Sequence, residues 1–392
     1  MEKKPLQKRT ITDDRIVYLL STIDIRYNIT GAERYTYENA KFLRENGIDS
    51  RILVPDKSKG AVRLRKDYKE VVRYYRAIPK IRIKNNVTGL TGFGMNNYSG
   101  LPKNGIIYFL MSIYDYLPNL FLKPKGQKYV MGSGGMFVFE GNHISKNHRL
   151  LERLLNCFLR VWLNTGDRRK NIFFHVITDR QRGYLMKQLG ISSDRIFYIP
   201  LWVDTTKFRM NPKSGNRLKV MHIGGKGKNS GMVLEIANKI AAEGRTDEFE
   251  FCFLGRGNGL TENPDPEKNI SALINITDEK KAKEIAKSDV LVVPHPEETF
   301  SFAMLEALAS GLVPIVSESN PAIDKIIGAG ALAYKAKSIR DYIAALDAIS
   351  RLKKGKGYDG MRKANREVAV RIYDKKVVNT SMMDMFARVQ ES

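Results

Sequence analysis

Short apolar runs alternate with longer amphipathic segments along this 392-residue chain. In the first half, the runs that predict buried strands are Arg15–Leu20, Ile48–Val54, Gly105–Met111, Lys128–Met131, Ile172–Ile177 and Arg195–Ile199. A second series follows at Leu218–Ile223, Phe249–Leu254, Ile270–Ile274, Asp289–Val293, Val313–Val316 and Ala331–Ala333. Strand spacings of roughly 20 to 30 residues, with helical patterns between them, predict parallel sheets covered by helices.

Helical patterns occupy several of the segments between these strands. The predicted helices include Ala32–Glu45, Arg149–Leu163, Thr178–Leu189 and Ala303–Ser310. After Pro200 the chain runs through a polar, proline-bearing connection, PLWVDTTKFRMNPKSGNR, which is typical of a linker between domains. The predicted fold class is therefore α/β, with two Rossmann-like domains that face each other across a cleft.

The composition adds a strong positive charge to this picture. Hydrophobic residues make up 43% of the chain, enough for real cores, and the formal net charge is +24. Such a surplus favours polyanionic partners, namely nucleic acid, anionic lipid headgroups or phosphorylated substrates. The sequence has no zinc-ligand spacing, no aromatic RNA-binding motif and no basic zipper. We therefore expect no nucleic-acid partner, although this class stays as a rival hypothesis.

The cysteines and the N-terminus indicate a cytoplasmic protein. Cys157 and Cys252 each stand among apolar residues and show no disulfide or metal spacing, so we expect two buried thiols. The first 15 residues lack the apolar core of a secretory signal. No apolar run approaches the ~20 residues that span a bilayer. Any membrane contact is expected to be peripheral.

Residues 56–84 form the most basic stretch of the chain, with eleven basic side chains against three acidic ones. Valine, tyrosine and isoleucine are interleaved with the charges, and Pro79 would end a helix here. Two interpretations stay open. The segment either lies on an anionic membrane surface, or it is a solvated helix that is basic because the whole chain is.

Glycine-rich loops follow several of the predicted strands. In the second half, Gly224-Gly225-Lys226-Gly227-Lys228 stands between a strand and a helix, where backbone N–H groups and lysine can bind a diphosphate. Gly255–Gly259 is a weaker loop of the same kind. In the first half, Gly132–Gly135 ends a strand and Gly31 precedes a helix. For each loop the alternative is an ordinary turn.

A pair of carboxylates follows the strand Asp289–Val293. Glu298 stands in a polar loop, and Glu306 stands in what we expect to be the first turn of the next helix. A carboxylate at Glu306 can accept hydrogen bonds from two hydroxyls, as ribose recognition requires. Glu297 is a rival for the role of Glu298. The alternative is two surface glutamates favoured by the helix dipole.

Three segments resemble the GT-B glycosyltransferases of family 4, also called glycosyl transferases group 1. They are GAERYTYENAKFLRENGI, VITDRQRGYLMKQLGISSDRIFYIPLWVDTTKF and ETFSFAMLEALASGLVPIV. The last one places seven residues between Glu298 and Glu306, which is the family's Glu-x7-Glu spacing. The resemblance covers nearly the whole chain. It implies residues 1–203 as the acceptor domain, 204–375 as the donor domain, and a C-terminal helix, 376–392, that packs back on the first domain.

The resemblance also implies roles for single residues. Glu298 would contact the donor sugar, and Glu306 would bind the ribose hydroxyls. The other implied donor-binding residues are Gly31, Gly224, Gly225, Lys226, Lys228, Phe300, Ser301 and Phe302. Glu298 and Lys228 are the implied catalytic residues. The family retains anomeric configuration and uses no metal, so we expect no cofactor beyond the nucleotide-sugar substrate.

Some positions depart from the family's pattern. Gly225 stands where the family has an arginine, so Lys226 or Lys228 must supply the charge, and Lys228-Asn229 fits the family better. On the acceptor side, Gly134 and Gly135 stand where a His-Gly pair is frequent. Leu201–Asp204 replaces the usual Asn-Gly-Val-Asp.

The expected activity is transfer of a sugar from a nucleotide-diphospho-sugar to an acceptor hydroxyl with retention. The basic first domain favours a lipid-linked glycan or glycolipid acceptor at the cytoplasmic face of the membrane. The alternatives are a transferase for a soluble acceptor and a non-catalytic GT-B subunit, the second motivated by Gly134 and Gly225. The sugar, the nucleotide and the linkage stay open.

Overall fold

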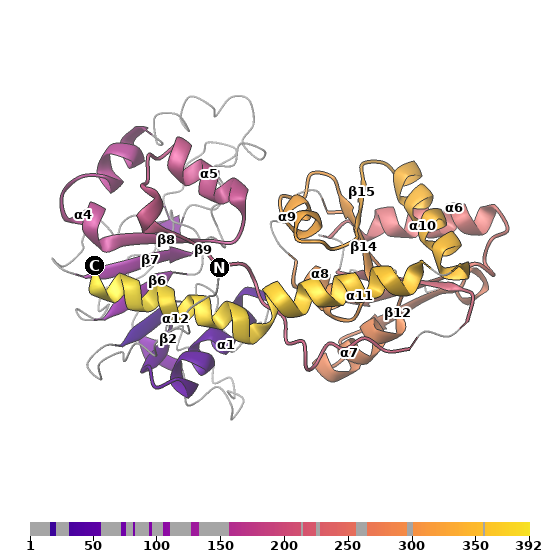
Figure 1. Cartoon of the computed structure of the whole chain (residues 1–392), viewed down its shortest axis with the longest axis horizontal. Coiled ribbons are helices and arrows are strands. Elements are labelled where there is room, and N and C mark those ends of the chain that lie inside the picture. The colour runs from indigo at the N-terminus through magenta and orange to yellow at the C-terminus, as the bar shows by residue number, and fades with distance from the viewer. Residues whose placement is uncertain are drawn as a thin grey trace. The chain divides into compact units, whose positions relative to one another are not determined.

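The structure is a computed structural model that describes residues 16–20, 31–55, 72–75, 81–82, 94–95, 105–109, 127–132, 157–212, 215–224, 228–255, 265–295, 301–355 and 357–392. The chain divides into two compact units (Figure 1). Unit 1 comprises Met1–Ile199 and Asn379–Ser392, and unit 2 comprises Pro200–Val378. The sequence placed the divisions after residues 203 and 375.

Unit 1 is built on a seven-stranded parallel sheet with the order β3-β2-β1-β6-β7-β8-β9. Its strands are β1 Val17–Leu20, β2 Ser50–Pro55, β3 Val72–Tyr75, β6 Ile106–Phe109, β7 Lys128–Gly132, β8 Ile172–Val176 and β9 Ile196–Tyr198. A short antiparallel pair is formed by β4 Ile81–Arg82 and β5 Gly94–Met95. β6 and β8 are buried along their whole length, as strands covered on both faces must be.

The helices of unit 1 cover both faces of this sheet. They are α1 Gly31–Glu45, α4 Gly166–Asn171, α5 Asp179–Lys187, a helical stretch at 157–163, and the C-terminal part of α12 Lys375–Glu391. Right-handed crossovers in opposite directions place α1 and α5 on opposite sides of the sheet (Figure 1). Thr178 begins α5 with a capping box to Gln181.

The C-terminal helix packs against unit 1 through specific contacts. The ring of Phe386 meets Tyr108 of β6 edge-on at 5.7 Å between ring centres. The ammonium of Lys128 on β7 donates to the carbonyl of Gln390 at 3.0 Å. These contacts explain why residues 379–392 belong to unit 1 although they come last in the sequence.

Unit 2 has a six-stranded parallel sheet with the order β12-β11-β10-β13-β14-β15. Its strands are β10 Leu218–Ile223, β11 Phe249–Gly255, β12 Ile270–Ile274, β13 Val290–Val293, β14 Val313–Ser317 and β15 Tyr334–Ala336. Counted along the chain, this is the order 3-2-1-4-5-6 of a doubly wound sheet, which reverses direction between β10 and β13.

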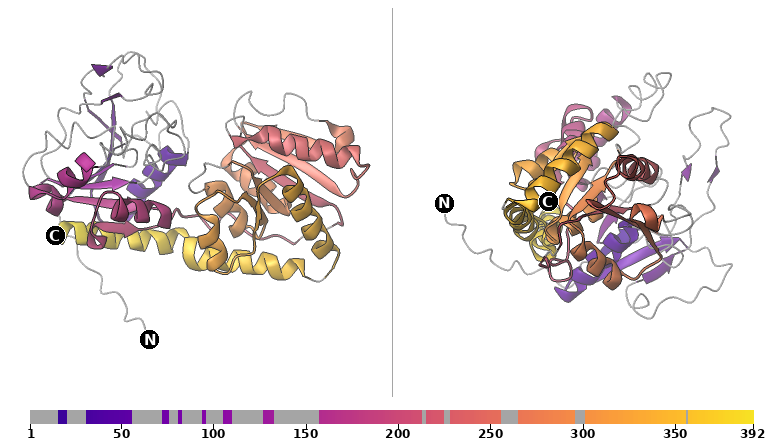
Figure 2. Two further views of the ribbon diagram at one scale, coloured as in Figure 1. Left: turned by 90° about the horizontal axis from the view of Figure 1, so that it is seen from above. Right: turned by 90° about the vertical axis from the view of Figure 1, so that its right-hand side faces the viewer.

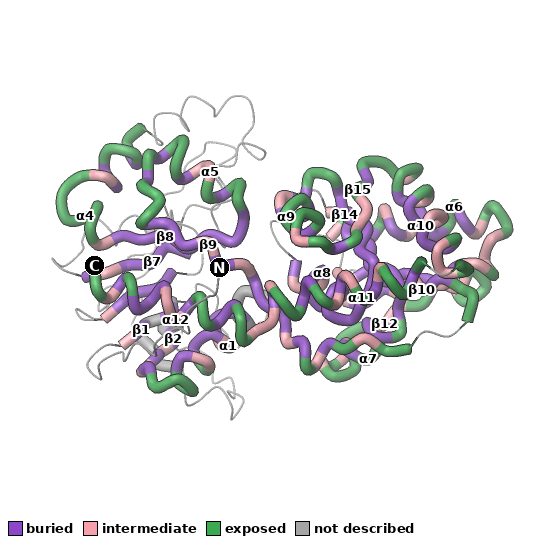
Figure 3. Tube along the Cα trace, viewed as in Figure 1, coloured by how far each residue is buried: buried purple, intermediate pink, exposed green. Residues whose placement is uncertain are grey.

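Helices cover this second sheet on both sides (Figure 2). They are α6 Ser230–Ala242, α7 Asp278–Lys287, α8 Phe302–Ala309, α9 Ile323–Gly328, α10 Ile339–Lys354 and α11 Tyr358–Val368, which continues as a π-helical turn at Ala369–Tyr373. Most of these helices bury one side only, whereas α8 is buried from Met304 to Ala309 (Figure 3). The apolar composition of α8 therefore reflects a helix inside the core.

The predicted strands are confirmed to within a few residues, except the last. The apolar run Ala331–Ala333 is not a strand, and β15 begins at Tyr334 instead. The backbone of Leu332 bonds to the side chain of Asn365, which donates to its carbonyl at 3.0 Å and accepts from its N–H at 2.6 Å. These hydrogen bonds take the place of sheet pairing at Leu332.

Two other expectations need correction. The basic segment 56–84 contains β3, which pairs in parallel with β2, so Val72–Tyr75 is not part of a helix. β-Branched and aromatic side chains favour that strand. The cysteines are not both buried, because Cys157 is exposed and Cys252 is only partly buried.

Candidate functional site

The predicted donor segments follow the two strands that flank the reversal of strand order in unit 2. β10 ends at Ile223 and leads into Gly224 and the glycine loop, and β13 ends at Val293 and leads toward Ser301. β10 and β13 pair directly and run in parallel, so both loops leave the sheet at the same edge. Ligands of open α/β sheets bind at this kind of edge.

His222 joins the two strands close to this edge. It is buried, and its Nδ1 lies 3.0 Å from the carbonyl oxygen of Val292, so Nδ1 carries the hydrogen and donates it. The ring also packs edge-on against Phe253 at 5.9 Å. The sequence analysis missed His222, although a polar residue inside an apolar strand, just before the glycine loop, was a visible signal.

Gly224 has a conformation that only glycine adopts readily, with φ +150°. A Cβ at this position would lie 2.5 Å from Cβ and 2.7 Å from Cγ of Lys228, closer than real carbon atoms approach. The sequence analysis placed Gly224 in a loop that binds a diphosphate, and that role stays a prediction. The structure shows that the stem of Lys228 packs against Gly224, so the absence of a side chain at Gly224 leaves room for the lysine.

Lys228 and its neighbours lead directly into α6. Asn229 has a left-handed conformation, with φ 59° and ψ 37°, and α6 begins at Ser230. The first turn of α6 contains no acidic side chain. The half-buried residue Lys228 and a helix N-terminus whose first turn has no acidic side chain make this position favourable for an anion.

The helix α8 begins one residue earlier than predicted. The Ser301 hydroxyl accepts from the N–H of Met304 at 3.4 Å and caps the helix, and Phe302 is its first residue. Glu306 is consequently the fifth residue of α8 and lies in the second turn, not the first. It is 2% exposed, so it is not a surface glutamate.

Glu306 is paired with a lysine that the sequence analysis did not identify. The Nζ of Lys281 lies 2.5 Å from Oε2 of Glu306. Lys281 belongs to α7, and its side chain is 21% exposed, compared with 3% for the side chain of Glu306. Burying an ionised carboxylate is costly unless a partner compensates its charge, and Lys281 supplies that compensation.

Phe302 contacts the segment that connects the two units. Its ring meets Trp202 edge-on, with ring centres 6.2 Å apart. The ammonium of Lys375 lies over the ring of Trp202, 5.0 Å from its centre. Val203 exchanges backbone hydrogen bonds with Tyr373 and Lys375, at 2.8 and 2.9 Å. Within unit 2, the predicted donor-binding residue Phe302 thus packs against Trp202, which the sequence analysis did not select as a site residue.

Several predicted site residues lie outside the described residues. They are Gly134, Gly135, Gly225, Lys226, Glu298 and Phe300. Their roles stay predictions from the resemblance. Gly31 is described as the first residue of α1, which lies between β1 and β2 in the chain of unit 1.

A buried polar network lies inside unit 1, away from these loops. The Nε2 of His175 donates to the carbonyl of Ile199 at 2.8 Å, and its Nδ1 accepts from the Tyr108 hydroxyl at 2.6 Å. Burial lowers the pKa of His175 to about 4 and raises that of Tyr35, whose ring stacks on the imidazole at 6.5 Å, to about 12. Both groups are therefore neutral at physiological pH.

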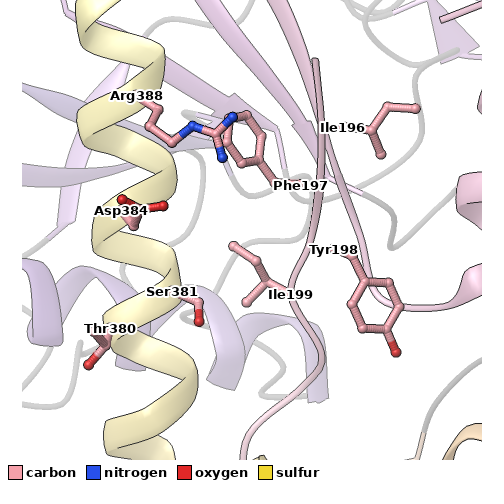
Figure 4. Close-up of a pocket in the computed structure, with 8 residues that line it drawn as sticks. All are labelled: Ile196, Phe197, Tyr198, Ile199, Thr380, Ser381, Asp384 and Arg388. Atoms are coloured by element: carbon pink, nitrogen blue, oxygen red, sulfur yellow. The ribbon is translucent and has the colours of Figure 1, made fainter. Parts of the chain in front are cut away.

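Unit 1 also has a pocket of about 370 Å³ between β9 and α12 (Figure 4). Its lining consists of Ile196, Phe197, Tyr198, Ile199, Thr380, Ser381, Asp384 and Arg388. The guanidinium of Arg388 lies 4.9 Å from the centre of the Phe197 ring (Figure 4). None of the predicted donor or acceptor residues lines this pocket.

Metal-binding and membrane-spanning features were sought in the described part of the chain. No group of three or more His, Cys, Asp or Glu side chains there could hold a metal ion. None of the helices in the same residues has the length and apolar character that crossing a bilayer requires.

The sequence and the fold of the chain both resemble those of known glycosyltransferases. Residues 218–352 match the family model described as glycosyl transferases group 1. The MMP alpha-(1->4)-mannosyltransferase of Mycolicibacterium hassiacum is 28% identical over 152 residues, which are 37% of this chain and 36% of that protein. The match thus spans about a third of each of the two proteins.

Solved structures resemble the chain over nearly its whole length. A glycosyltransferase from Rickettsia africae has a TM-score of 0.68 at 12% identity, and the match covers 97% of this chain and 100% of that one. Anabaena HepE in complex with UDP and glucose has a TM-score of 0.62 at 13% identity, with coverage of 95% and 99%. The chain therefore carries a glycosyl transferases group 1 domain over residues 218–352, and its fold is that of the GT-B glycosyltransferases.

Proposed function

We propose that the chain is a retaining glycosyltransferase that uses a nucleotide-diphospho-sugar. One observation carries the proposal: the glycine loop at Gly224 and the segment leading to Ser301 leave the sheet side by side, where the strand order of unit 2 reverses. A doubly wound sheet binds nucleotides at this position.

The residues at this edge fit the parts of such a donor. The half-buried Lys228 and the N-terminus of α6 offer positive charge to the diphosphate. Glu306, oriented by Lys281, offers carboxylate oxygen to the ribose hydroxyls. The start of α8 at Ser301 and Phe302 offers backbone groups to the donor, and Glu298 is proposed to contact its sugar.

The proposed reaction needs charge stabilisation more than bond-making by the protein. The acceptor hydroxyl attacks the anomeric carbon on the face from which the diphosphate leaves. A new carbon–oxygen bond forms, the bond to the phosphate oxygen breaks, and that oxygen takes the proton of the hydroxyl. Lys228 and helix N–H groups stabilise the negative charge on the leaving diphosphate, so the proposal includes no metal.

The comparisons narrow the donors worth testing. The relative from Mycolicibacterium hassiacum is a mannosyltransferase, and HepE was solved with UDP and glucose. Mannosyl and UDP-glucosyl donors are therefore the first two candidates. The +24 charge supports a lipid-linked or other glycan acceptor at the cytoplasmic face of a membrane. A soluble acceptor and a non-catalytic subunit are the alternatives.

Incubation with UDP-, GDP- and ADP-sugars tests the class of reaction. We expect hydrolysis or transfer with one nucleotide class, and a product of unchanged anomeric configuration by NMR. Glu298→Gln and Glu306→Ala should each lower the rate, because they remove proposed donor contacts. Donor binding without turnover on any acceptor would favour the non-catalytic subunit, and inversion at the anomeric carbon would refute retention.

A further inference from the structure

One side of unit 1 exposes large apolar side chains. Phe158 is 46% exposed, Val161 65% and Met186 41%. Phe158 and Val161 stand three residues apart on the helical stretch 157–163, so they share its outer face. Met186 stands on α5. Exposed apolar side chains that gather on neighbouring elements can mark an interaction surface.

The two helices that carry these side chains pack side by side. Their inner residues, Leu159 and Leu163 on one helix and Leu185 on the other, belong to one buried cluster. The side-chain amide of Asn164 donates to the carbonyl of Leu189 at 2.9 Å, which joins the ends of the two helices. Because both bury their inner faces in the same core, their outer faces lie on the same side of the sheet.

The same segment of unit 1 is rich in exposed basic side chains. The exposed basic residues of this part of unit 1 are Arg160, Arg169, Lys170, Arg180, Arg182 and Lys187. Within residues 157–190 only Asp167 and Asp179 are exposed acidic residues. We call Phe158, Val161, Met186 and these six basic residues the apolar-basic face.

We propose that the apolar-basic face docks on a bilayer containing anionic lipid headgroups. The basic side chains suit the headgroups, and the apolar side chains suit the boundary with the acyl chains. A second copy of the chain is disfavoured, because two strongly basic faces repel each other. A nucleic acid would use the charge but leave Val161 and Met186 without a partner.

This inference deepens the proposed function and rests on it in one respect, namely that a lipid-linked acceptor would be met at this surface. It places the membrane contact on residues 157–190.

Vesicle co-sedimentation of the full chain tests the proposal. We expect binding to vesicles with 30% phosphatidylserine, weaker binding to pure phosphatidylcholine, and a loss with rising salt. Phe158→Glu with Val161→Glu should lower the partition coefficient on anionic vesicles about tenfold or more. The matched control, Ile274→Glu with Leu332→Glu, makes the same change at exposed apolar residues of unit 2 and should bind as the wild type.

The basic part of the face has its own test. Arg169→Gln with Lys170→Gln should weaken binding to anionic vesicles about threefold or more and reduce its salt dependence. Arg340→Gln with Lys363→Gln removes the same charge from unit 2 and serves as the control. Equal effects of both pairs would show that only net charge matters, which would overturn the proposal.

Exposed Cys157 gives a direct probe of contact, because it neighbours Phe158. An environment-sensitive dye on Cys157, in a Cys252→Ser background, should shift to shorter wavelength with anionic vesicles and not with single-stranded RNA. An unchanged spectrum on bound vesicles would refute this face. Donor binding without vesicles separates the two hypotheses. The variants of the apolar-basic face should bind the nucleotide sugar as the wild type does. A wild type that binds no nucleotide sugar, yet binds anionic vesicles through this face, would refute the proposed function alone.

Discussion

The ammonium of Lys281 on α7 lies 2.5 Å from a carboxylate oxygen of Glu306 in α8. The side chain of Glu306 is buried, whereas the side chain of Lys281 stays partly open to solvent. The pair therefore keeps a charged acceptor of hydrogen bonds inside the protein, where ribose recognition would need it.

Lys281→Ala should weaken donor binding while the fold persists. Without its partner, Glu306 is expected to lose the orientation that Lys281 gives it, and the KM for the donor should rise about tenfold. The free energy of unfolding should fall by only about 1–2 kcal/mol, because the Lys281 side chain is partly exposed. Lys283→Ala on the exposed side of α7 is the control. An unchanged KM in Lys281→Ala, with a raised KM in Glu306→Ala, would mean that the pair is only structural.

Gly224→Ala should displace Lys228. The added Cβ would overlap the stem of Lys228 at 2.5 Å, and φ +150° is unfavourable for alanine. We expect donor affinity to fall about tenfold or more by titration calorimetry. Gly231→Ala, next to the same loop, meets no atom within 4 Å and adds a better helix former to α6, so it should bind normally.

Lys353→Ala should destabilise unit 2 without affecting the donor. The Nζ of Lys353 lies 2.6 Å from Asp289, whose other carboxylate oxygen accepts from Tyr358 at 3.0 Å, and the side chains of the ion pair are 7% and 1% exposed. Loss of one partner of such a pair costs about 3 kcal/mol. Asp289 precedes β13, whereas the predicted donor segment follows this strand. The affinity of the folded protein for the donor should therefore not change.

The neighbouring Lys354 provides the control for that measurement. Its bond to Glu248 is long, at 3.3 Å, and both side chains are exposed enough to be well solvated. Lys354→Ala should change the free energy of unfolding by less than about 0.5 kcal/mol in denaturant titrations. Equal losses in the two variants would contradict the assignment of the buried pair.

Unit 1 should lose stability in acid because of His175. Its pKa is about 4 in the folded protein, below its usual 6.5, so the unfolded chain binds more protons between these values. The stabilisation is complete above pH 6.5, is lost as pH falls to about 4, and amounts to about 3 kcal/mol. His175→Gln should flatten this dependence. Fluorescence of Trp162, in a Trp202→Phe background, follows unit 1 alone.

The fold was largely predictable because parallel strands buried on both faces leave continuous apolar runs in the sequence. Given those runs, right-handed crossovers leave few arrangements for β10 to β15. The strand β3 was missed because eleven basic residues of its segment dominated the pattern, although Val72–Tyr75 has strand-forming side chains. Ala331–Ala333 was apolar for a reason other than a strand, which only the position of Asn365 reveals.

The site was predictable in part. Two sequence motifs contain the residues that could be selected in advance: the glycine-rich loop has Gly224 and Lys228, and the Glu-x7-Glu segment has Ser301 and Glu306. The order of the strands brings the two segments to the same edge of the sheet. Lys281 carried no such signal, because it is one of several lysines on α7 and only the packing of α7 on α8 selects it. The packing of the Lys228 side chain against Gly224 could not be predicted either, because no local sequence pattern specifies the direction of that side chain.

Calorimetric titration of the full chain with UDP-, GDP- and ADP-sugars tests the central claim most directly. The account predicts that one nucleotide class binds the wild type and Gly231→Ala equally, and binds Gly224→Ala and Glu306→Ala about tenfold or more weakly. Equal affinity in all four proteins would contradict a donor site at the edge between β10 and β13, and so would the absence of binding by every nucleotide sugar.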